Sequence, residues 1–433
     1  MSDLRCNFAG IESPNPYWLA SAPPSNSAYQ VERAFDAGWG GAVWKTIGEP
    51  IVNVTSRYAS IDYGHTRVMG LNNIELITDR PLADNLRELR QVKKKYPKHA
   101  LIASLMVESK QKAWHDIVKA TEDTGVDGLE LNFGCPHGMS ERGMGAAVGQ
   151  VPEYTRMITE WVKEVARTPV IVKLTPNISD VRHIAAAACE GGADGLSLIN
   201  TINSIMGVDL KTLAPRPQVG GKSTHGGYCG PAVKPIALNM VSQVCAHPKV
   251  KVPVSGIGGI STWSDAAEFL LLGSTSVQVC TAVMHYGFRI IEDLCDGLSN
   301  WMDEMGFRTL DEVRGKSLHR IVGWGDLDLN YKLIAKIHPE KCIGCQLCYI
   351  ACEDGSHQSI RLVPGQRTPE IKEAECVGCN LCQMVCPVEG CIDMVEVKSS
   401  KKTMSWREFQ SKSGKEKETC EQALPKETPP RSG

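Results

Sequence analysis

The sequence lacks long apolar runs and any strong excess of one charge. No segment approaches the roughly 18 consecutive apolar residues of a membrane-spanning helix, and the start, MSDLRCNF, has no secretory pattern. With 47 basic and 49 acidic side chains the formal net charge is -2, so the composition indicates neither a nucleic-acid nor an anionic-membrane partner. We therefore expect a cytoplasmic protein that binds no membrane and no nucleic acid.

Cysteine, by contrast, is abundant and unevenly distributed. Eight of the 17 cysteines lie between Cys342 and Cys386, whereas only seven precede residue 330. In a reducing compartment such a block indicates metal binding or redox chemistry rather than disulfides. Because 433 residues exceed a single ordinary core, we expect a large α/β domain followed by a small cysteine-rich one.

Before the cysteine block, short apolar runs alternate with amphipathic stretches, as in the βα units of a parallel sheet. In SDVRHIAAAACEGG, Ser179 is expected to cap a helix that Gly191 and Gly192 stop. Eight such units predict a (β/α)8 TIM barrel, with an open doubly wound sheet as the alternative. The expected strands are WLASAP at 18–23, GAVWKT at 41–46, LIASLMV at 101–107, GLELNFG at 128–134, VIVKL at 170–174, GLSLIN at 195–200, VPVSGIGG at 252–259 and SVQVCTAV at 276–283.

Composition divides the chain into four expected parts. These are a barrel at 1–318, a linker at 319–334, the cysteine-rich domain at 335–397 and a tail at 398–433. The tail is polar and charged, so it cannot bury enough apolar surface to offset its ordering entropy. We expect it to be disordered; the alternative is a partner-binding segment around Trp406.

Two copies of the motif C-x2-C-x2-C-x3-C form the cysteine block. The spacing resembles that of bacterial two-cluster ferredoxins, small α+β domains in which the fourth cysteine of each motif binds the other [4Fe-4S] cluster. Structural zinc sites are the alternative. A zinc site needs only two close cysteine pairs, however, so zinc does not explain the third and fourth cysteines of each motif. Cys391 and Cys420 lie outside the motifs. By the ferredoxin rule, one cluster is bound by Cys342, Cys345, Cys348 and Cys386, and the other by Cys376, Cys379, Cys382 and Cys352.

The C-terminal ends of the expected strands carry chemically useful residues. TIM-barrel active sites lie at these ends, and the loops after the last two strands commonly bind phosphate through backbone N–H groups. Next to iron-sulfur clusters, this pattern predicts flavin mononucleotide (FMN); tight turns that need positive φ are the alternative for the glycines. The residues are Ser21, Lys45, Thr46, Asn132, Cys135, Lys173, Asn200, Thr201, Gly256, Gly258, Gly259, Cys280 and Thr281.

Several longer motifs carry a resemblance to a known family. They are LNFGCPHGMSERGMG from Leu131, NNIELI from Asn72, KLTPN from Lys173, INTINS from Ile199, GGYCGPAVKPIAL from Gly226 and SGIGGI from Ser255. Together with the ferredoxin block they resemble the flavin and iron-sulfur part of NAD-dependent dihydropyrimidine dehydrogenases, as far as about residue 397. The barrel is more distantly similar to that of dihydroorotate dehydrogenases.

This resemblance implies reversible reduction of the 5,6 double bond of uracil or thymine. Hydride would pass from FMN N5 to ring C6, and the Cys135 thiol, on a glycine-rich mobile lid, would donate a proton to C5. Lys45 and Lys173 would stabilise the anionic reduced flavin. The alternative for the two lysines is an ion pair across the barrel, and the alternative for Cys135 is an inert buried thiol. Amide side chains match the ring edge, and the implied substrate-binding residues are Asn73, Glu75, Asn132, Asn200 and Thr201.

The source of the electrons is expected to be another chain. No G-x-G-x-x-G follows an expected strand, so no Rossmann-type nicotinamide site is indicated. The resemblance implies a partner subunit that carries FAD and the NADH site, with this chain as a homodimer in the complex. Two other functions stay open: a dihydroorotate dehydrogenase, and a non-catalytic electron-transfer module in which the barrel is only a scaffold.

Overall fold

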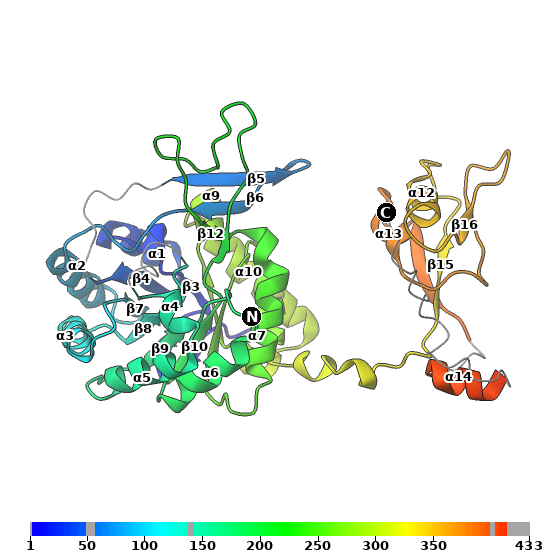
Figure 1. The fold of residues 1–433 in the computed structure, drawn as a ribbon. Coiled ribbons are helices and arrows are strands. Elements are labelled where there is room, and N and C mark those ends of the chain that lie inside the picture. The colour runs from blue at the N-terminus through cyan, green and yellow to red at the C-terminus, as the bar shows by residue number, and fades with distance from the viewer. Residues whose placement is uncertain (1, 49–56, 137–142, 399–402, 414–433) are drawn as a thin grey trace, which may run out of the picture. The chain divides into compact units, whose positions relative to one another are not determined.

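The computed structural model describes residues 2–48, 57–136, 143–398 and 403–413 (Figure 1). The chain divides into two compact units, Met1–Ile321 and Val322–Gly433, close to the expected end of the barrel at residue 318. The first strand of the second unit starts at Leu333, inside the segment expected to be a linker. Within the described ranges, no helix has both the length and the apolar character needed to cross a membrane.

Eight parallel strands close into a barrel in the first unit, in the order in which they occur along the chain. Each expected run supplies one strand, so the TIM barrel is confirmed and the open doubly wound sheet is wrong. The runs are rich in Val, Ile, Leu and Ala because parallel strands covered by helices are buried on both faces. The strands are β3 Tyr17–Leu19, β4 Gly41–Ile47, β7 Ala100–Leu105, β8 Gly128–Asn132, β9 Val170–Lys173, β10 Gly195–Leu198, β13 Val254–Ile257 and β14 Ser276–Val279.

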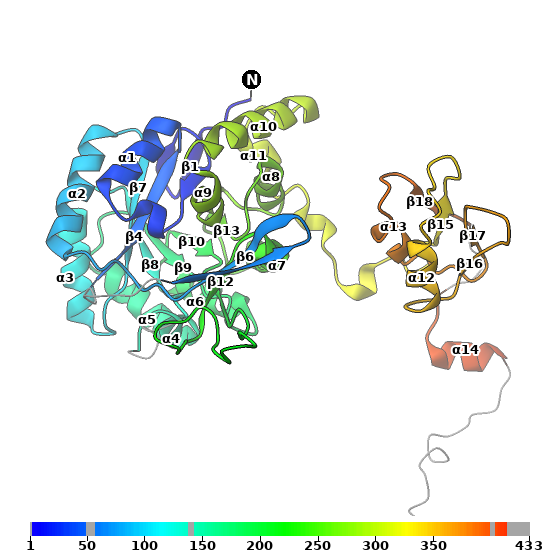
Figure 2. The same cartoon turned by 90° about the horizontal axis from the view of Figure 1, so that it is seen from above.

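Helices surround this barrel (Figure 2). One helix ends at Gly38, which has a φ of 114° and donates its N–H to the carbonyls of Ala34 and Phe35. Another starts differently: Asp180, not Ser179, caps it by accepting a hydrogen bond from the Arg182 amide. The long helices are α1 Ala28–Ala37, α2 Leu82–Lys95, α3 Gln111–Glu122, α5 Pro152–Lys163, α6 Val181–Glu190, α7 Lys234–Cys245, α8 Trp263–Leu271 and α10 Ile290–Met305; α4 Ala146–Gly149, α9 Thr281–Tyr286 and α11 Leu310–Val313 are short.

A short hairpin covers the N-terminal end of the barrel. Its strands are β1 Cys6–Phe8 and β2 Ile11–Ser13. A Cβ on Gly195, the first residue of β10, would lie 2.7 Å from the Phe8 ring, and one on Gly128 would lie 2.8 Å from Ile11. Glycine therefore lets the hairpin pack directly on the strand starts, which leaves the opposite end for the active site.

A four-stranded antiparallel sheet, which the sequence did not predict, lies above the barrel (Figure 1). Its order is β11 Ile202–Ser204, β12 Gly226–Cys229, β6 Thr66–Asn73 and β5 Tyr58–Tyr63. The strand GGYC has little intrinsic β-propensity, so tertiary contacts decide its conformation. A Cβ on Gly227 would lie 2.2 Å from Thr201 Oγ1, and glycine thus permits the sheet to approach the barrel rim.

The second unit is a small α+β fold. Strands β15 Leu333–Ile337 and β18 Ile392–Glu396 pair antiparallel, as do β16 Ile360–Arg361 and β17 Glu370–Ile371. Helix α12 Leu347–Glu353 contains the last two cysteines of the first motif, and helix α13 Leu381–Met384 contains the third cysteine of the second. The two motifs share one backbone shape, since Gly344 and Gln346 have positive φ, as do Gly378 and Asn380.

Part of the expected tail is helical. Helix α14 spans Trp406–Ser413, within a segment for which composition predicted disorder. Ser405 and Glu408 cap the start of this helix. The Glu408 carboxylate accepts a hydrogen bond from the Ser405 amide at 2.6 Å, and the Glu408 amide donates to Ser405 Oγ at 3.3 Å. This S-x-x-E capping box was readable in the sequence. Trp406 is exposed, while Cys420 and the rest of the tail from residue 414 lie outside the described residues.

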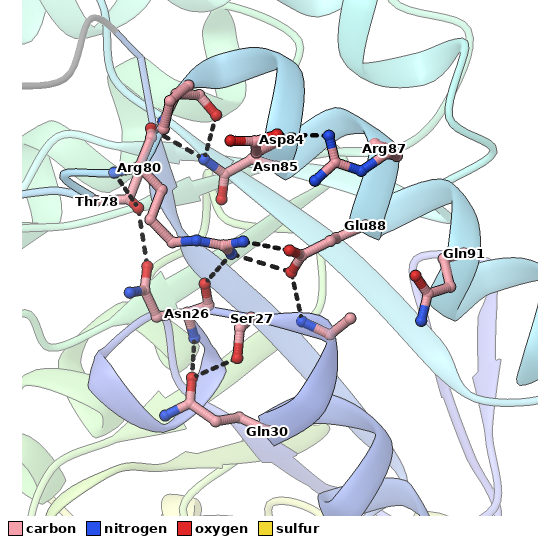
Figure 3. Close-up of polar contacts among 12 residues, drawn as sticks. Asn26, Ser27, Gln30, Thr78, Arg80, Asp84, Asn85, Arg87, Glu88 and Gln91 are labelled. Atoms are coloured by element: carbon pink, nitrogen blue, oxygen red, sulfur yellow. Dashed lines mark hydrogen bonds and ion pairs between the residues drawn. The ribbon is translucent and has the colours of Figure 1, made fainter.

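A half-buried polar cluster joins the loop after β3 to the segment that leads from β6 into α2 (Figure 3). Arg80 forms a two-pronged ion pair with Glu88, and it also donates to the Asn26 carbonyl at 2.7 Å. The other Glu88 contact is the amide of Ala28 at 2.7 Å, at the start of α1. Thr78 donates to the Asn26 side chain at 2.8 Å. The cluster thereby fixes both loops against α1 and α2.

We expect Glu88→Gln to lower the free energy of unfolding at pH 7 by about 2 kcal/mol, because a half-buried arginine loses its charged partner. Burial alone would raise the pKa of Glu88, but hydrogen bonds from Arg80 and the Ala28 amide hold that pKa below its ordinary value. The stabilisation is therefore complete above the ordinary glutamate pKa and is lost as pH falls through the folded-state pKa. Denaturant unfolding between pH 7 and pH 3 measures this loss.

Asp84→Asn is the matched control, since the Asp84–Arg87 pair lies on the same helix but is exposed. It should change stability by only a few tenths of a kcal/mol. Equal effects of the two substitutions, or a Glu88→Gln effect that persists in acid, would contradict the role of the cluster.

Candidate active site

One large cavity lies at the C-terminal ends of the barrel strands, next to the inserted sheet. It encloses about 1150 Å³, including space open to solvent, which suits a cofactor together with a substrate. Its wall contains every barrel residue that the sequence analysis predicted to bind cofactor or substrate or to act in catalysis, except Gly256. These are Ser21, Lys45, Thr46, Asn73, Glu75, Asn132, Cys135, Lys173, Asn200, Thr201, Gly258, Gly259, Cys280 and Thr281.

Gly256 lies outside the wall of the cavity. It lies inside β13, and a Cβ there would stand 2.4 Å from the Phe269 ring on α8. Glycine at this position therefore allows helix α8 to pack closely on the strand. The hypothesis that Gly256 contacts a cofactor receives no support from the structure.

A chain of hydroxyl and amide groups crosses the cavity wall from strand to strand. Thr46 Oγ1 lies 3.1 Å from Ser21 Oγ and 2.9 Å from Ser104 Oγ, and it accepts a bond from Asn132 Nδ2 at 3.0 Å. The Asn132 carbonyl oxygen in turn accepts from Asn200 Nδ2 at 3.0 Å. Each group therefore fixes the rotamer of the next, so that the wall presents an ordered set of donors and acceptors.

Lys45 and Glu75 form a buried ion pair with an Nζ–Oε1 distance of 2.5 Å. The second Glu75 oxygen accepts a bond from the Tyr58 hydroxyl at 2.7 Å. Burial, and then the bond to Glu75, raise the pKa of Tyr58 well above its ordinary value, so the phenol stays protonated and donates. The ion pair considered as the alternative for Lys45 is thus present, and it lies in the cavity wall.

Lys173 also faces a carboxylate. Its Nζ lies 3.6 Å from Oε1 of Glu130, which is completely buried inside the barrel. The other Glu130 oxygen accepts bonds from Ser197 Oγ at 2.8 Å and Gln278 Nε2 at 2.9 Å. Lysine and glutamate thus compensate each other's charge where neither can reach bulk water.

Cys135 lies at the edge of the cavity with 8% of its surface exposed. It packs with Ile77, Met106 and Met144 in a small apolar cluster. Its carbonyl accepts a hydrogen bond from the Ala146 amide at 3.0 Å. The expected lid continues through residues 137–142, which lie outside the described residues, so the mobility of the lid stays a prediction.

Two glycine-containing turns meet on the other side of the cavity. Gly258 and Gly259 have φ values of 130° and 76°, and a Cβ on Gly259 would lie 2.9 Å from the Lys234 amide nitrogen and 3.0 Å from the Gly230 carbonyl. Only glycine therefore lets these loops approach each other. Beside them Thr281 Oγ1 donates to Cys229 Sγ at 3.3 Å, and burial, followed by the neighbouring Cys229, raises the pKa of Cys280.

In the second unit the cysteines gather across the two motifs. Cys352 of the first motif and three cysteines of the second, Cys376, Cys379 and Cys382, line one small cavity. Burial raises the pKa of Cys348, and the electrostatic effect of its neighbours Cys345, Cys342 and Cys386 adds to this rise. Cys352 thus lies with three cysteines of the other motif, and Cys386 is a neighbour of the first motif. Which thiols bind which cluster stays a prediction of the ferredoxin rule. In the described ranges, no three His, Cys, Asp or Glu side chains surround a point suited to a single metal ion.

Sequence reasoning missed five polar residues of the cavity wall: Tyr58, Tyr228, Cys229, Ser261 and Gln278. The first three lie on the inserted sheet or at its end, which was not predicted. For Gln278 a signal was available, because a lone amide within the apolar run SVQV is unusual for a strand buried on both faces.

Comparison with known proteins agrees with this architecture. The family model described as dihydroorotate dehydrogenase matches residues 3–302, and that described as a 4Fe-4S dicluster domain matches residues 335–394. A solved dihydroorotate dehydrogenase from Eimeria tenella has the same fold, with a TM-score of 0.60 at 20% identity over 72% of this chain and 88% of that one.

Curated relatives are much more similar in sequence. The NAD-dependent dihydropyrimidine dehydrogenase subunit PreA of Escherichia coli is 45% identical over 92% of this chain and 97% of its own length. The chloroplastic dihydropyrimidine dehydrogenase (NADP(+)) of Arabidopsis thaliana is 45% identical over 75% of this chain and 79% of its own length. The dihydroorotate dehydrogenase B (NAD(+)) catalytic subunit of Pyrococcus abyssi is 38% identical over 73% of this chain and 99% of its own length. The chain therefore belongs to the dihydropyrimidine dehydrogenase family of oxidoreductases, as a dihydroorotate dehydrogenase-type barrel joined to a 4Fe-4S dicluster domain.

Proposed function

We propose that the chain catalyses reversible reduction of the 5,6 double bond of uracil or thymine, with Cys135 as the acid that protonates C5. The observation that carries this proposal is the convergence in one cavity of the Cys135 thiol, the hydrogen-bonded amides of Asn132 and Asn200, and Lys173. These groups come from β8, β9, β10 and the loops that follow them. A scaffold without catalytic function would not need them together.

The cavity suits FMN, the cofactor expected of this barrel family. The turns at Gly258 and Gly259, close to Cys280 and Thr281, line the cavity with backbone that only glycine allows at this close approach of two loops, and we assign the phosphate to them. Gln278 Oε1 is a buried acceptor without a partner among the described residues, as expected where a ligand completes the bonding. Ser21, Thr46, Asn132, Lys45 and Lys173 would hold the rest of the cofactor. Bound FMN supplies hydride to C6 of the ring.

The pyrimidine edge alternates carbonyl acceptors with N–H donors, and amide side chains offer the complementary groups. We assign its recognition to the set Asn73, Glu75, Asn132, Asn200 and Thr201. Asn200 is well fixed for this task, because its Nδ2 bonds to Asn132 and its carbonyl oxygen accepts from the Thr201 amide at 2.7 Å. A rigid set of this kind discriminates against rings that would leave its polar groups unpaired.

Protonation of C5 is assigned to Cys135. A thiol has an ordinary pKa near 8.5 and is mostly protonated at neutral pH, so it can donate a proton without a separate acid. Its neighbours Ile77, Met106 and Met144 are apolar and pack against it. They also limit access of water to the reacting carbon.

We assign two [4Fe-4S] clusters to the second unit, with the ligand sets that the motif rule gives. Eight thiols grouped three plus one provide the all-sulfur donor set that such clusters need. The Ser359 amide donates to Cys352 Sγ at 3.2 Å, a contact of the kind that tunes cluster potential. Bound clusters supply a path for electrons from a partner subunit that carries FAD and oxidises NADH, in a complex in which this chain is a homodimer.

We expect Cys135→Ala to reduce kcat for uracil by roughly 10²–10⁴-fold, the usual contribution of a general acid. Cys135→Ser should retain more activity, with the pH profile changed, because a hydroxyl is a weaker acid. Flavin and cluster absorbance and uracil binding should persist in both. Cys189→Ala, which removes a half-buried thiol on α6, is the control and should retain full activity. Unchanged turnover in Cys135→Ala would show that another group protonates C5, whereas a wild type that does not reduce uracil would favour the electron-transfer module.

Cluster ligation is tested by iron content. Cys352→Ala and Cys386→Ala remove the ligand that each motif contributes to the other cluster, so each variant should lose about four iron atoms per chain. Cys391→Ala is the control: Cys391 is buried in the same unit but outside the motifs, and it should retain all the iron. Zinc in place of iron and sulfide in the wild type would overturn the assignment.

Uracil should be reduced much faster than orotate when a reduced dye supplies electrons. An orotate carboxylate requires an available cation, and the two cations in the described cavity wall, Lys45 and Lys173, both face carboxylates. With NADH as the only reductant, the isolated chain should turn over far more slowly. Preference for orotate would identify a dihydroorotate dehydrogenase, and rapid NADH oxidation would remove the need for a partner.

A further inference from the structure

Gln278 occupies an unusual position for an amide. It lies on strand β14, its side chain is only 1% exposed, and it forms part of the cavity wall. The strand otherwise contributes Val277 and Val279 to the apolar core. A buried amide is costly unless both its donor and its acceptor are satisfied, so each end of this one requires a partner.

The donor end is satisfied across the barrel interior. Gln278 Nε2 donates to Glu130 Oε2 at 2.9 Å, although β8 and β14 are not neighbours in the barrel. A carboxylate only accepts hydrogen bonds, so Glu130 dictates which end of the amide faces it. Glu130 is itself held by Ser197 at 2.8 Å and faces Lys173 at 3.6 Å. The side-chain orientation of Gln278 is therefore fixed.

The acceptor end has no such partner. Gln278 Oε1 is buried and has no hydrogen-bond donor among the described residues. Leaving such an acceptor unpaired is unfavourable, and a donor from a bound molecule would remove that penalty. Because Nε2 faces Glu130, Oε1 is the end of the amide that remains for a ligand, and Gln278 forms part of the cavity wall.

We propose that Gln278 is an FMN-binding residue whose Oε1 accepts the hydrogen bond of the isoalloxazine N3–H, with Glu130 as the residue that positions it. This inference rests on the proposed use of FMN. Oxidised isoalloxazine has a single N–H, at N3 between two carbonyl groups, and it needs an acceptor in a pocket that excludes water. The adjacent carbonyls need donors, of which Lys173 is one in the same wall.

The test uses the full chain with its clusters retained and its flavin removed, titrated with FMN by fluorescence quenching. Gln278→Met keeps the length of the side chain and removes the acceptor, so the dissociation constant of FMN should rise roughly tenfold. Ser197→Ala is the matched control: it removes the other bond to Glu130 Oε2, but Ser197 is not part of the cavity wall. Its FMN affinity should stay within about twofold of the wild type.

A modified cofactor tests the same hydrogen bond from the ligand side. The wild type should prefer FMN to 3-methyl-FMN, which has no N3–H, and Gln278→Met should lose most of that preference. Equal FMN affinity of Gln278→Met and wild type, an equal loss in Ser197→Ala, or an unchanged preference in Gln278→Met would overturn the proposal. If Gln278→Met does not fold, equal affinity of the wild type for both cofactors would overturn it. A wild type that binds no FMN would instead refute the proposed function.

Discussion

Closure of eight parallel strands into one barrel is the constraint on which the active site depends. Because all strands run in the same direction, their carboxyl ends meet at one rim, and residues as distant in sequence as Ser21 and Met284 line one cavity. The hairpin β1–β2 packs on the other end of the barrel, where Gly128 and Gly195 leave room for it. The cavity therefore lies at the C-terminal end of the barrel, and the hairpin closes the N-terminal end.

Charge inside the barrel follows from the same geometry. Lys45, Lys173, Glu75 and Glu130 come from different strands or loops, yet each cation lies against a carboxylate. Burying any of them alone would be costly, whereas paired and hydrogen-bonded they form a polar wall that needs no rearrangement to receive a ligand. Tyr58 and Gln278 extend these pairs to the inserted sheet and to β14.

Local patterns predicted the elements whose signal is strong within the segment itself. The eight barrel strands, the strand-end residues and the two cysteine motifs were all readable because apolar runs, polar strand ends and fixed cysteine spacings are local features. Other features were missed or assigned wrongly. Asp180 replaced Ser179 as a cap, and α14 formed where composition indicated disorder. Both helix starts are set by a nearby capping side chain, Asp180 in one case and Ser405 with Glu408 in the other.

The sequence by itself determined the barrel, the cysteine-rich unit and nearly all residues of the cavity wall, because periodicity and motif spacing are properties of the chain. Only the tertiary structure decided that GGYC becomes a strand above the rim, that Lys45 pairs with Glu75, and that Glu130 orients Gln278 across the barrel. Such contacts join residues 30 to 148 positions apart. No local pattern encodes them, since burial makes them favourable only after the strands have closed.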